Sequence, residues 1–182
     1  MRSWATDDFL PLDGVLNDMT DATIAIRPAS AADARAIGAV FDAAVRAGWT
    51  YLGELAQEPM FGLEEWEREV AAHAPPNVLL VASDKAAGGI VGFVAAHPAD
   101  GELYLLFVHP DAAGRGVGRR LLEAAHDALR AAGCRSAFLF THERNERALA
   151  VYRAAGYRPD GGVRESDFRG TPIRELRLVR PL

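Results

Sequence analysis

Three glycines that alternate along a short segment are the residues of this chain best suited to bind an anion. Gly114, Gly116 and Gly118 follow the apolar run of residues 103–107 and precede the amphipathic run of residues 121–129. This order predicts a strand, a glycine loop and a helix. Without Cβ atoms in the way, several backbone N–H groups can converge, and the helix N-terminus adds unpaired donors and a positive dipole end. The segment therefore predicts a pyrophosphate site.

Two familiar phosphate-binding loops do not fit this segment. A P-loop needs a lysine followed by serine or threonine, and the only lysine of the chain is Lys85. A G-x-G-x-x-G dinucleotide fingerprint that starts at Gly114 meets Arg119 at its last glycine position, and one that starts at Gly116 meets Leu121. The sequence therefore disfavours a nucleotide-binding enzyme of either kind.

A second segment, residues 145–157, reads N-E-R-A-L-A-V-Y-R-A-A-G-Y. Asn145 is suited to cap a helix, Tyr152 lies two turns further on, and Gly156 is suited to end it. The two segments together resemble motifs A and B of the GNAT superfamily, the acyl-CoA-dependent N-acyltransferases. Gly116 and Gly118 match the last two positions of the motif A pattern [RQ]-x-x-G-x-[GA], whereas Ala113 replaces its arginine or glutamine.

The resemblance extends from about residue 23 to the C-terminus and implies the GNAT fold. This is an α/β fold (an α+β mixed sheet) with a mostly antiparallel, twisted sheet of six to seven strands flanked by about four helices. We interpret residues 1–22 as an N-terminal extension and residues 23–182 as the GNAT N-acetyltransferase domain. Hydrophobic periodicity and turn residues predict the order β-α-α-β-β-β-α-β-α-β-β. The predicted strands are residues 23–27, 77–83, 90–97, 102–108, 136–140, 164–168 and 173–179.

The resemblance also implies an activity, which is transfer of an acetyl group from acetyl-CoA to a primary amine by direct attack in a ternary complex. The alternative is a non-catalytic acyl-CoA-binding sensor or partner-binding module on the same fold.

Catalysis must overcome the protonation of the amine. A lysine-like amine of pKa about 10.4 is only about one part in 2,500 neutral at pH 7, which adds about 4.6 kcal/mol to the apparent activation barrier. The departing thiolate also needs a proton.

Tyr152 and Glu102 are the candidates for these two proton transfers. By resemblance, Tyr152 lies near the thioester sulfur and acts as the acid; alternatively it only packs its helix. Glu102 coincides with the glutamate base of histone-acetylating family members; alternatively it is a solvated glutamate at a strand end. Strand alternation predicts that Glu102 shares a face with Tyr104, Leu106 and Val108. Other members carry a glutamate on the next strand, where this chain has Phe140.

The expected acetyl-CoA site combines backbone groups of the strand and the loop with the second motif. By resemblance, the strand residues bind the pantetheine arm, one of their N–H groups polarises the thioester carbonyl, and the loop binds the pyrophosphate. The absence of an arginine or glutamine at position 113 predicts weakened rather than abolished binding. The predicted cofactor-binding residues are Leu106, Phe107, Val108, Ala113, Gly114, Arg115, Gly116, Val117, Gly118, Arg119, Asn145 and Tyr152.

Composition and residue spacing also bear on the partners, location and metal content expected of this chain. The 182 residues are 49% hydrophobic and carry a net charge of −5, which argues against a nucleic-acid partner. No apolar run is long enough to span a membrane, and no signal peptide is evident. Cys134 is the only cysteine, which favours a reducing, cytoplasmic location. His97, His109 and His142 lack metal-ligand spacing, so no metal is expected. The amine acceptor is not identified, and a homodimer is a state that many relatives adopt.

Overall fold

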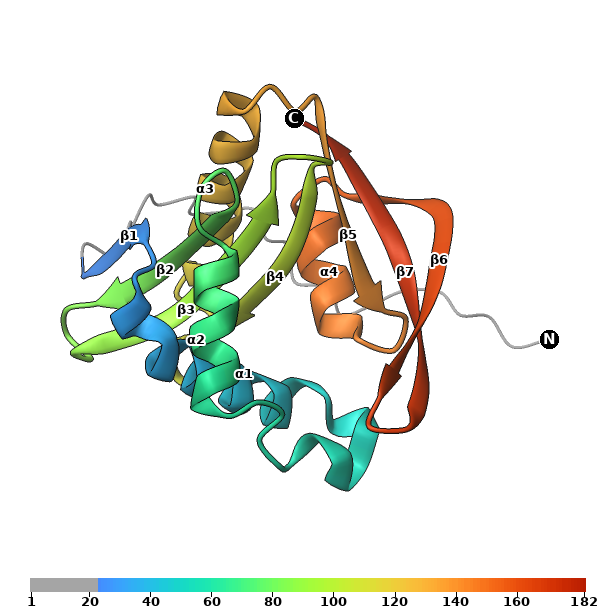
Figure 1. Ribbon diagram of the computed structural model, residues 1–182. Coiled ribbons are helices and arrows are strands. Elements are labelled where there is room, and N and C mark those ends of the chain that lie inside the picture. The colour runs from blue at the N-terminus through green and yellow to red at the C-terminus, as the bar shows by residue number, and fades with distance from the viewer. Residues whose placement is uncertain (1–22) are drawn as a thin grey trace, which may run out of the picture.

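The computed structural model describes residues 23–182, and a seven-stranded sheet in the order β1-β2-β3-β4-β5-β7-β6 forms its centre (Figure 1). The strands are β1 (Ile24–Pro28), β2 (Val78–Asp84), β3 (Gly89–His97), β4 (Glu102–Val108), β5 (Ser136–His142), β6 (Arg158–Phe168) and β7 (Thr171–Pro181). The helices are α1 (Ala34–Gly48), α2 (Leu63–Ala72), α3 (Val117–Ala131) and α4 (Glu146–Ala154), with 3-10 turns η1 (Ala31–Asp33), η2 (Thr50–Ala56) and η3 (Pro110–Ala112). Neighbouring strands are antiparallel except β4 and β5. The predicted α/β fold with a mostly antiparallel sheet and the predicted element order are confirmed.

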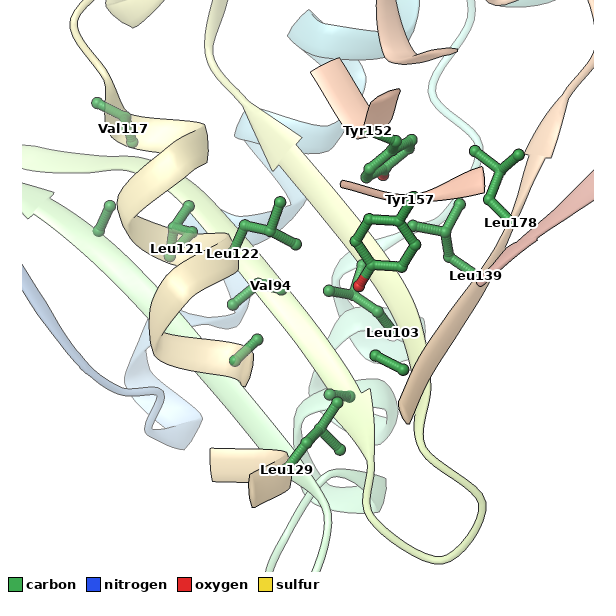
Figure 2. Close-up of a cluster of buried hydrophobic side chains, with 14 of the residues drawn as sticks. Val94, Leu103, Val117, Leu121, Leu122, Leu129, Leu139, Tyr152, Tyr157 and Leu178 are labelled. Atoms are coloured by element: carbon green, nitrogen blue, oxygen red, sulfur yellow. The ribbon is translucent and has the colours of Figure 1, made fainter. Parts of the chain in front are cut away.

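The sheet separates two hydrophobic cores because successive strand residues point to opposite faces. Phe93 of β3 packs with α1 and α2 in one core, beside Phe41 and Trp66. Its neighbour Val94 packs with α3 and α4 in the other. Figure 2 shows the second core, where the rings of Tyr152 and Tyr157 lie among leucines of the sheet. The helices that carry the two motifs thus share one face of the sheet.

Several element boundaries differ from the sequence prediction. The first helical segment starts as η1, where Ser30 and Asp33 form a capping box, so α1 begins only at Ala34. The connection between α1 and α2 contains η2. β6 begins six residues before its predicted start because its pairing with β7 is irregular between Pro159 and Val163, which interrupts the alternation of side chains.

Two further predictions concern the N-terminal extension and the expected absence of a membrane span. The N-terminal extension, residues 1–22, lies outside the described residues. Within residues 23–182, no helix combines the length and apolar character that crossing a membrane requires.

Candidate functional site

The two parallel strands at the centre of the sheet separate soon after they meet. The β4–β5 pairing is recorded at a single position, where Glu102 faces Phe138. Beyond it, β4 stays paired with β3, and β5 with β7. Figure 1 shows α4 in the space between the diverging strands. Since a strand edge without a neighbour presents free N–H and C=O groups, the end of β4 can hydrogen-bond an extended ligand.

A cavity of about 360 Å³, here called the loop cavity, lies at this divergence. Its wall combines the end of β4, the glycine loop, the start of α3, the end of α1 and one face of α4. Two arginines, Arg119 and Arg147, line the cavity, and none of the described residues in its wall is acidic. Its polar composition therefore suits an anionic ligand.

The glycine loop presents its backbone to this cavity. Gly114 and Gly116 have φ values of 79° and 75°, in the left-handed region that favours glycine. A Cβ added at either position would meet no atom within 4 Å, so the backbone conformation rather than crowding requires glycine there. Gly116 is the N-cap of α3, and its carbonyl accepts the N–H of Arg120. The N–H groups at the first helical positions have no intrahelical acceptor and can bind an anion.

Every predicted cofactor-binding residue except Arg115 lies in the wall of the loop cavity. The Arg115 guanidinium instead pairs with the buried carboxylate of Asp84, with 2.7 Å between Nη1 and Oδ2. This contact holds the pKa of Asp84 below its usual range. Ala113 lies in the wall, so the arginine or glutamine of the motif A pattern is replaced there by a methyl group. The loop therefore offers backbone donors, and Arg119 and Arg147 place cations in the same cavity wall.

The second motif adds Asn145 and Tyr152 from α4. Asn145 Oδ1 accepts the N–H of Ala148 at 3.1 Å, so the side chain caps the helix as predicted. Tyr152 is only 8% exposed, yet it lines the loop cavity, and burial raises the pKa of its hydroxyl well above its usual value. Its ring packs edge-on against Tyr157 (Figure 2), whose hydroxyl lies 2.7 Å from Nε2 of His126. Tyr152 therefore lies in the cavity wall with a hydroxyl that stays protonated at neutral pH.

A β-bulge in β4 changes which residues share a face. The pairing with β3 skips Tyr104, which is an extra residue in the strand. Leu103 and Leu106 consequently pack in the same core, beside α3, although strict alternation would place them on opposite faces. The prediction that Glu102 shares a face with Leu106 and Val108 is therefore wrong, whereas Tyr104 lies with Glu102 beside His97, as predicted.

Glu102 lies where β4 pairs with β5, before the two strands separate, and it does not line the loop cavity. Its side chain is 15% exposed, so it is not a fully solvated residue at a strand end. Oε2 lies 3.7 Å from Nδ1 of His97, and Oε1 lies 3.7 Å from Nη1 of Arg164 on β6. The structure thus brings Tyr152 and the loop together in one cavity and places Glu102 beside a histidine and an arginine.

The neighbours of Glu102 were not predicted from the sequence. His97, which was considered only as a metal ligand and excluded, is the last residue of β3 and faces Glu102 across the strand pair. The short turn between the two predicted strands is the signal that could have placed them opposite each other. Arg164 could not have been found in this way, because β6 is not a neighbour of β4 in the sheet.

A second cavity, of about 350 Å³, lies between α2 and β4. Phe41, Phe61, Trp66 and Tyr104 line it, together with the carboxylates of Glu65 and Glu69. We call it the aromatic cavity. No group of three or more His, Cys, Asp or Glu side chains within residues 23–182 is arranged to hold a metal ion.

Comparison of the sequence with protein families and with known proteins finds acetyltransferases. The model of the Acetyltransferase (GNAT) family matches residues 42–157. The chain is 42% identical over 88 residues to a mycothiol acetyltransferase of Propionibacterium freudenreichii subsp. shermanii, and 36% identical over 95 residues to one of Beutenbergia cavernae. These matches cover 45% and 50% of this chain, and 28% and 32% of the relatives. The chain therefore spans less than a third of the length of these curated relatives.

Solved structures share the fold over most of the chain. A GCN5-related N-acetyltransferase from Rhodopseudomonas palustris aligns with a TM-score of 0.71 and 25% identity, over 88% of this chain and 97% of that one. A phosphinothricin acetyltransferase from Sinorhizobium meliloti, solved in complex with AcCoA, aligns with a TM-score of 0.66 and 22% identity, over 88% and 89% of the two chains. With the family match over most of the chain, these findings show that this protein belongs to the GNAT acetyltransferase family.

Proposed function

We propose that this protein is an N-acetyltransferase that transfers the acetyl group of acetyl-CoA to a primary amine by direct attack in a ternary complex. One observation supports the proposal: the N-terminus of α3 and the buried Tyr152 line the same cavity. The open edge of β4 lies between them. The site thus offers, in that order, N–H donors for a pyrophosphate, a free strand edge for the pantetheine arm and a proton donor.

In this proposal, backbone groups perform most of the binding. The N–H groups from Gly114 to Arg119 hold the pyrophosphate, and the Arg119 side chain adds a positive charge. The unpaired groups at residues 106–108 hydrogen-bond the pantetheine arm. One of these N–H groups stabilises the oxyanion that develops on the thioester carbonyl. The cavity residues therefore fit acetyl-CoA without the motif A side chain that Ala113 lacks.

Tyr152 and Glu102 divide the proton transfers. A carboxylate at position 102 takes a proton from the acceptor ammonium, so that the neutral amine can form the new C–N bond. As the C–S bond breaks, the Tyr152 hydroxyl donates to the departing sulfur. Its raised pKa keeps it protonated throughout the neutral range, so it is always in the donor form.

The test is acetyl-CoA-dependent thiol release against a panel of aliphatic and aryl-alkyl primary amines and short peptides, with mass spectrometry of the products. The name of the curated relatives adds mycothiol-related amines to this panel. Release of CoA together with an acetylated amine supports the proposal. Saturable binding of acetyl-CoA without any acetylated product favours the sensor or partner-binding module instead, which the replacement at Ala113 also favours. A cytoplasmic location and a homodimer remain predictions from the sequence.

A further inference from the structure

A row of ionisable side chains crosses the sheet face beside α2. Nε2 of His73, just after α2, lies 3.1 Å from Nε2 of His97 on β3. Nδ1 of His97 lies 3.7 Å from Oε2 of Glu102, whose other oxygen faces Arg164. The ring of Tyr104 stacks on both imidazoles, with centroids 5.9 Å and 5.0 Å away. His73 and His97, here called the histidine pair, are therefore held in a fixed arrangement next to the proposed base.

The hydrogen bonds of the histidine pair determine where its protons lie. Nδ1 of His73 is 2.9 Å from the backbone carbonyl of Glu69, which can only accept, so this nitrogen carries hydrogen. In neutral His73, Nε2 is then an acceptor, and the hydrogen between the two rings belongs to Nε2 of His97. A neutral His97 therefore has a bare Nδ1, which is the nitrogen that faces Glu102.

We propose that His97 is a positioning residue of the reaction, which receives at Nδ1 the proton that Glu102 takes from the acceptor amine. This inference rests on the proposed function. The step balances: the ammonium N–H bond breaks and a Glu102 O–H bond forms, then that bond breaks and the Nδ1–H bond of His97 forms. Glu102 returns to a carboxylate, and the imidazolium releases its proton to water. Because 3.7 Å exceeds a direct hydrogen bond, a small approach of the two side chains completes the path.

The surrounding charges suit this role. On the α2 side, the Glu69 carboxylate lies 3.7 Å from Nδ1 of His73 and favours a cation on the pair. On the other side, Arg164 faces Glu102 but is held more closely by Glu175 of β7, at 2.7 Å. Tyr104 is a further titratable group packed against both rings.

The pair can also move the positive charge away from the acceptor. When His97 is protonated at both nitrogens, the hydrogen between the rings can pass to Nε2 of His73 without any ring rotation. His97 is then neutral with hydrogen on Nδ1, and the cation lies on His73 beside Glu69. The side chain of His97 is 27% exposed, so the proton can leave through it.

The first experiment is long-range ¹H–¹⁵N spectroscopy of protein labelled with ¹⁵N-histidine, without any ligand. His73→Phe and His97→Gln assign the two signals. At pH 8 we expect the Nδ1–H form for His73 and the Nε2–H form for His97; the Nδ1–H form for neutral His97 would overturn the inference. In Glu102→Gln, the ¹⁵N shift of His97 Nδ1 should change, because the carboxylate that faces this nitrogen is replaced by an amide. Glu165→Gln, an exposed residue of β6, is the control and should cause no shift.

The second experiment measures kinetics with the most active amine of the panel. His97→Gln retains an amide that can donate to His73 but has no titrating nitrogen toward Glu102. We expect kcat to fall at least about tenfold at pH 7, an unchanged KM for acetyl-CoA, and displacement of the acid limb of kcat/KM. An acid limb that stays in place indicates a structural role and contradicts the inference. Coupled histidines in a protein that acetylates no amine contradict the proposed function, whereas uncoupled histidines in an active enzyme contradict only this inference.

Discussion

Acidification from pH 7 to pH 5 should destabilise this protein through a histidine of α3 that lies outside the proposed site. His126 is 1% exposed, and its two ring nitrogens have fixed partners. Nδ1 lies 3.2 Å from Nη1 of Arg180, which can only donate, so Nδ1 is the acceptor and Nε2 donates to the Tyr157 hydroxyl at 2.7 Å. A second proton would have to enter between Nδ1 and the arginine. Burial, followed by the charge of Arg180, therefore lowers the pKa of His126 from 6.5 to about 4.

The size of the effect follows from linkage. Above pH 6.5, His126 is neutral in both the folded and the unfolded protein and contributes no pH dependence. Below pH 6.5 the unfolded chain takes up the proton and the folded protein does not, so the free energy of unfolding falls by about 1.4 kcal/mol per pH unit until about pH 4. At pH 5 the loss is about 2 kcal/mol. For a chain of this size this corresponds to a decrease of about 4–8 °C in Tm.

The measurement is Tm between pH 7 and pH 5 for the wild type and for His126→Gln, which keeps a neutral hydrogen-bonding side chain that does not titrate. The variant should show the smaller decrease, by about 4–8 °C. His109→Gln removes a histidine from a more exposed position and serves as the control. Burial also lowers the pKa of His142, so some decrease should remain in every protein. Parallel curves for the wild type and His126→Gln would refute the reasoning.

Three further predictions concern the proposed site. Acetyl-CoA at about 100 times its Kd should stabilise the wild type against thermal unfolding by about 2.7 kcal/mol. Gly116→Asp should abolish this stabilisation because it adds negative charge at the proposed anion site. Gly161 of β6 has a similar positive φ and open surroundings, so Gly161→Asp is the control and should preserve the stabilisation. Tyr152→Phe should lower kcat at least about tenfold with nearly unchanged acetyl-CoA binding, and turnover at the wild-type rate would remove the tyrosine from the mechanism. Glu102→Gln should lower kcat/KM about 10²–10⁴-fold near neutral pH and flatten the acid limb of the pH–rate profile. The control Glu165→Gln should leave the profile unchanged. A Glu102→Gln profile that superimposes on that of the wild type would exclude Glu102 as the base.

Local sequence signals predicted the elements and much of the loop cavity. The strand of residues 102–108, the glycine loop and the helix capped by Asn145 each depend on neighbouring residues, and the structure places them as expected. The bulge at Tyr104 was not predictable in this way, because the apolar run of the strand shows no break in the sequence.

Contacts between distant segments account for the remaining differences. Arg115 was predicted at the pyrophosphate, but its partner Asp84 lies at the end of β2, 31 residues earlier in the chain. His73 and His97 are 24 residues apart and meet only because α2 packs beside the end of β3. Neither contact has a periodicity or spacing signature. Sequence patterns therefore identified the backbone part of the site more completely than its charged side chains.

The divergence of β4 and β5 also has a consequence for the cooperativity of the molecule. Strands β1–β4 and β5–β7 form two blocks of antiparallel strands, joined by one parallel pairing at Glu102 and Phe138. Amide hydrogens on the two facing edges should exchange with solvent faster than those inside either block, because local opening there breaks few hydrogen bonds. A ligand lying between the edges would slow exchange on both. Hydrogen exchange would therefore map its path along the protein before any acceptor is known.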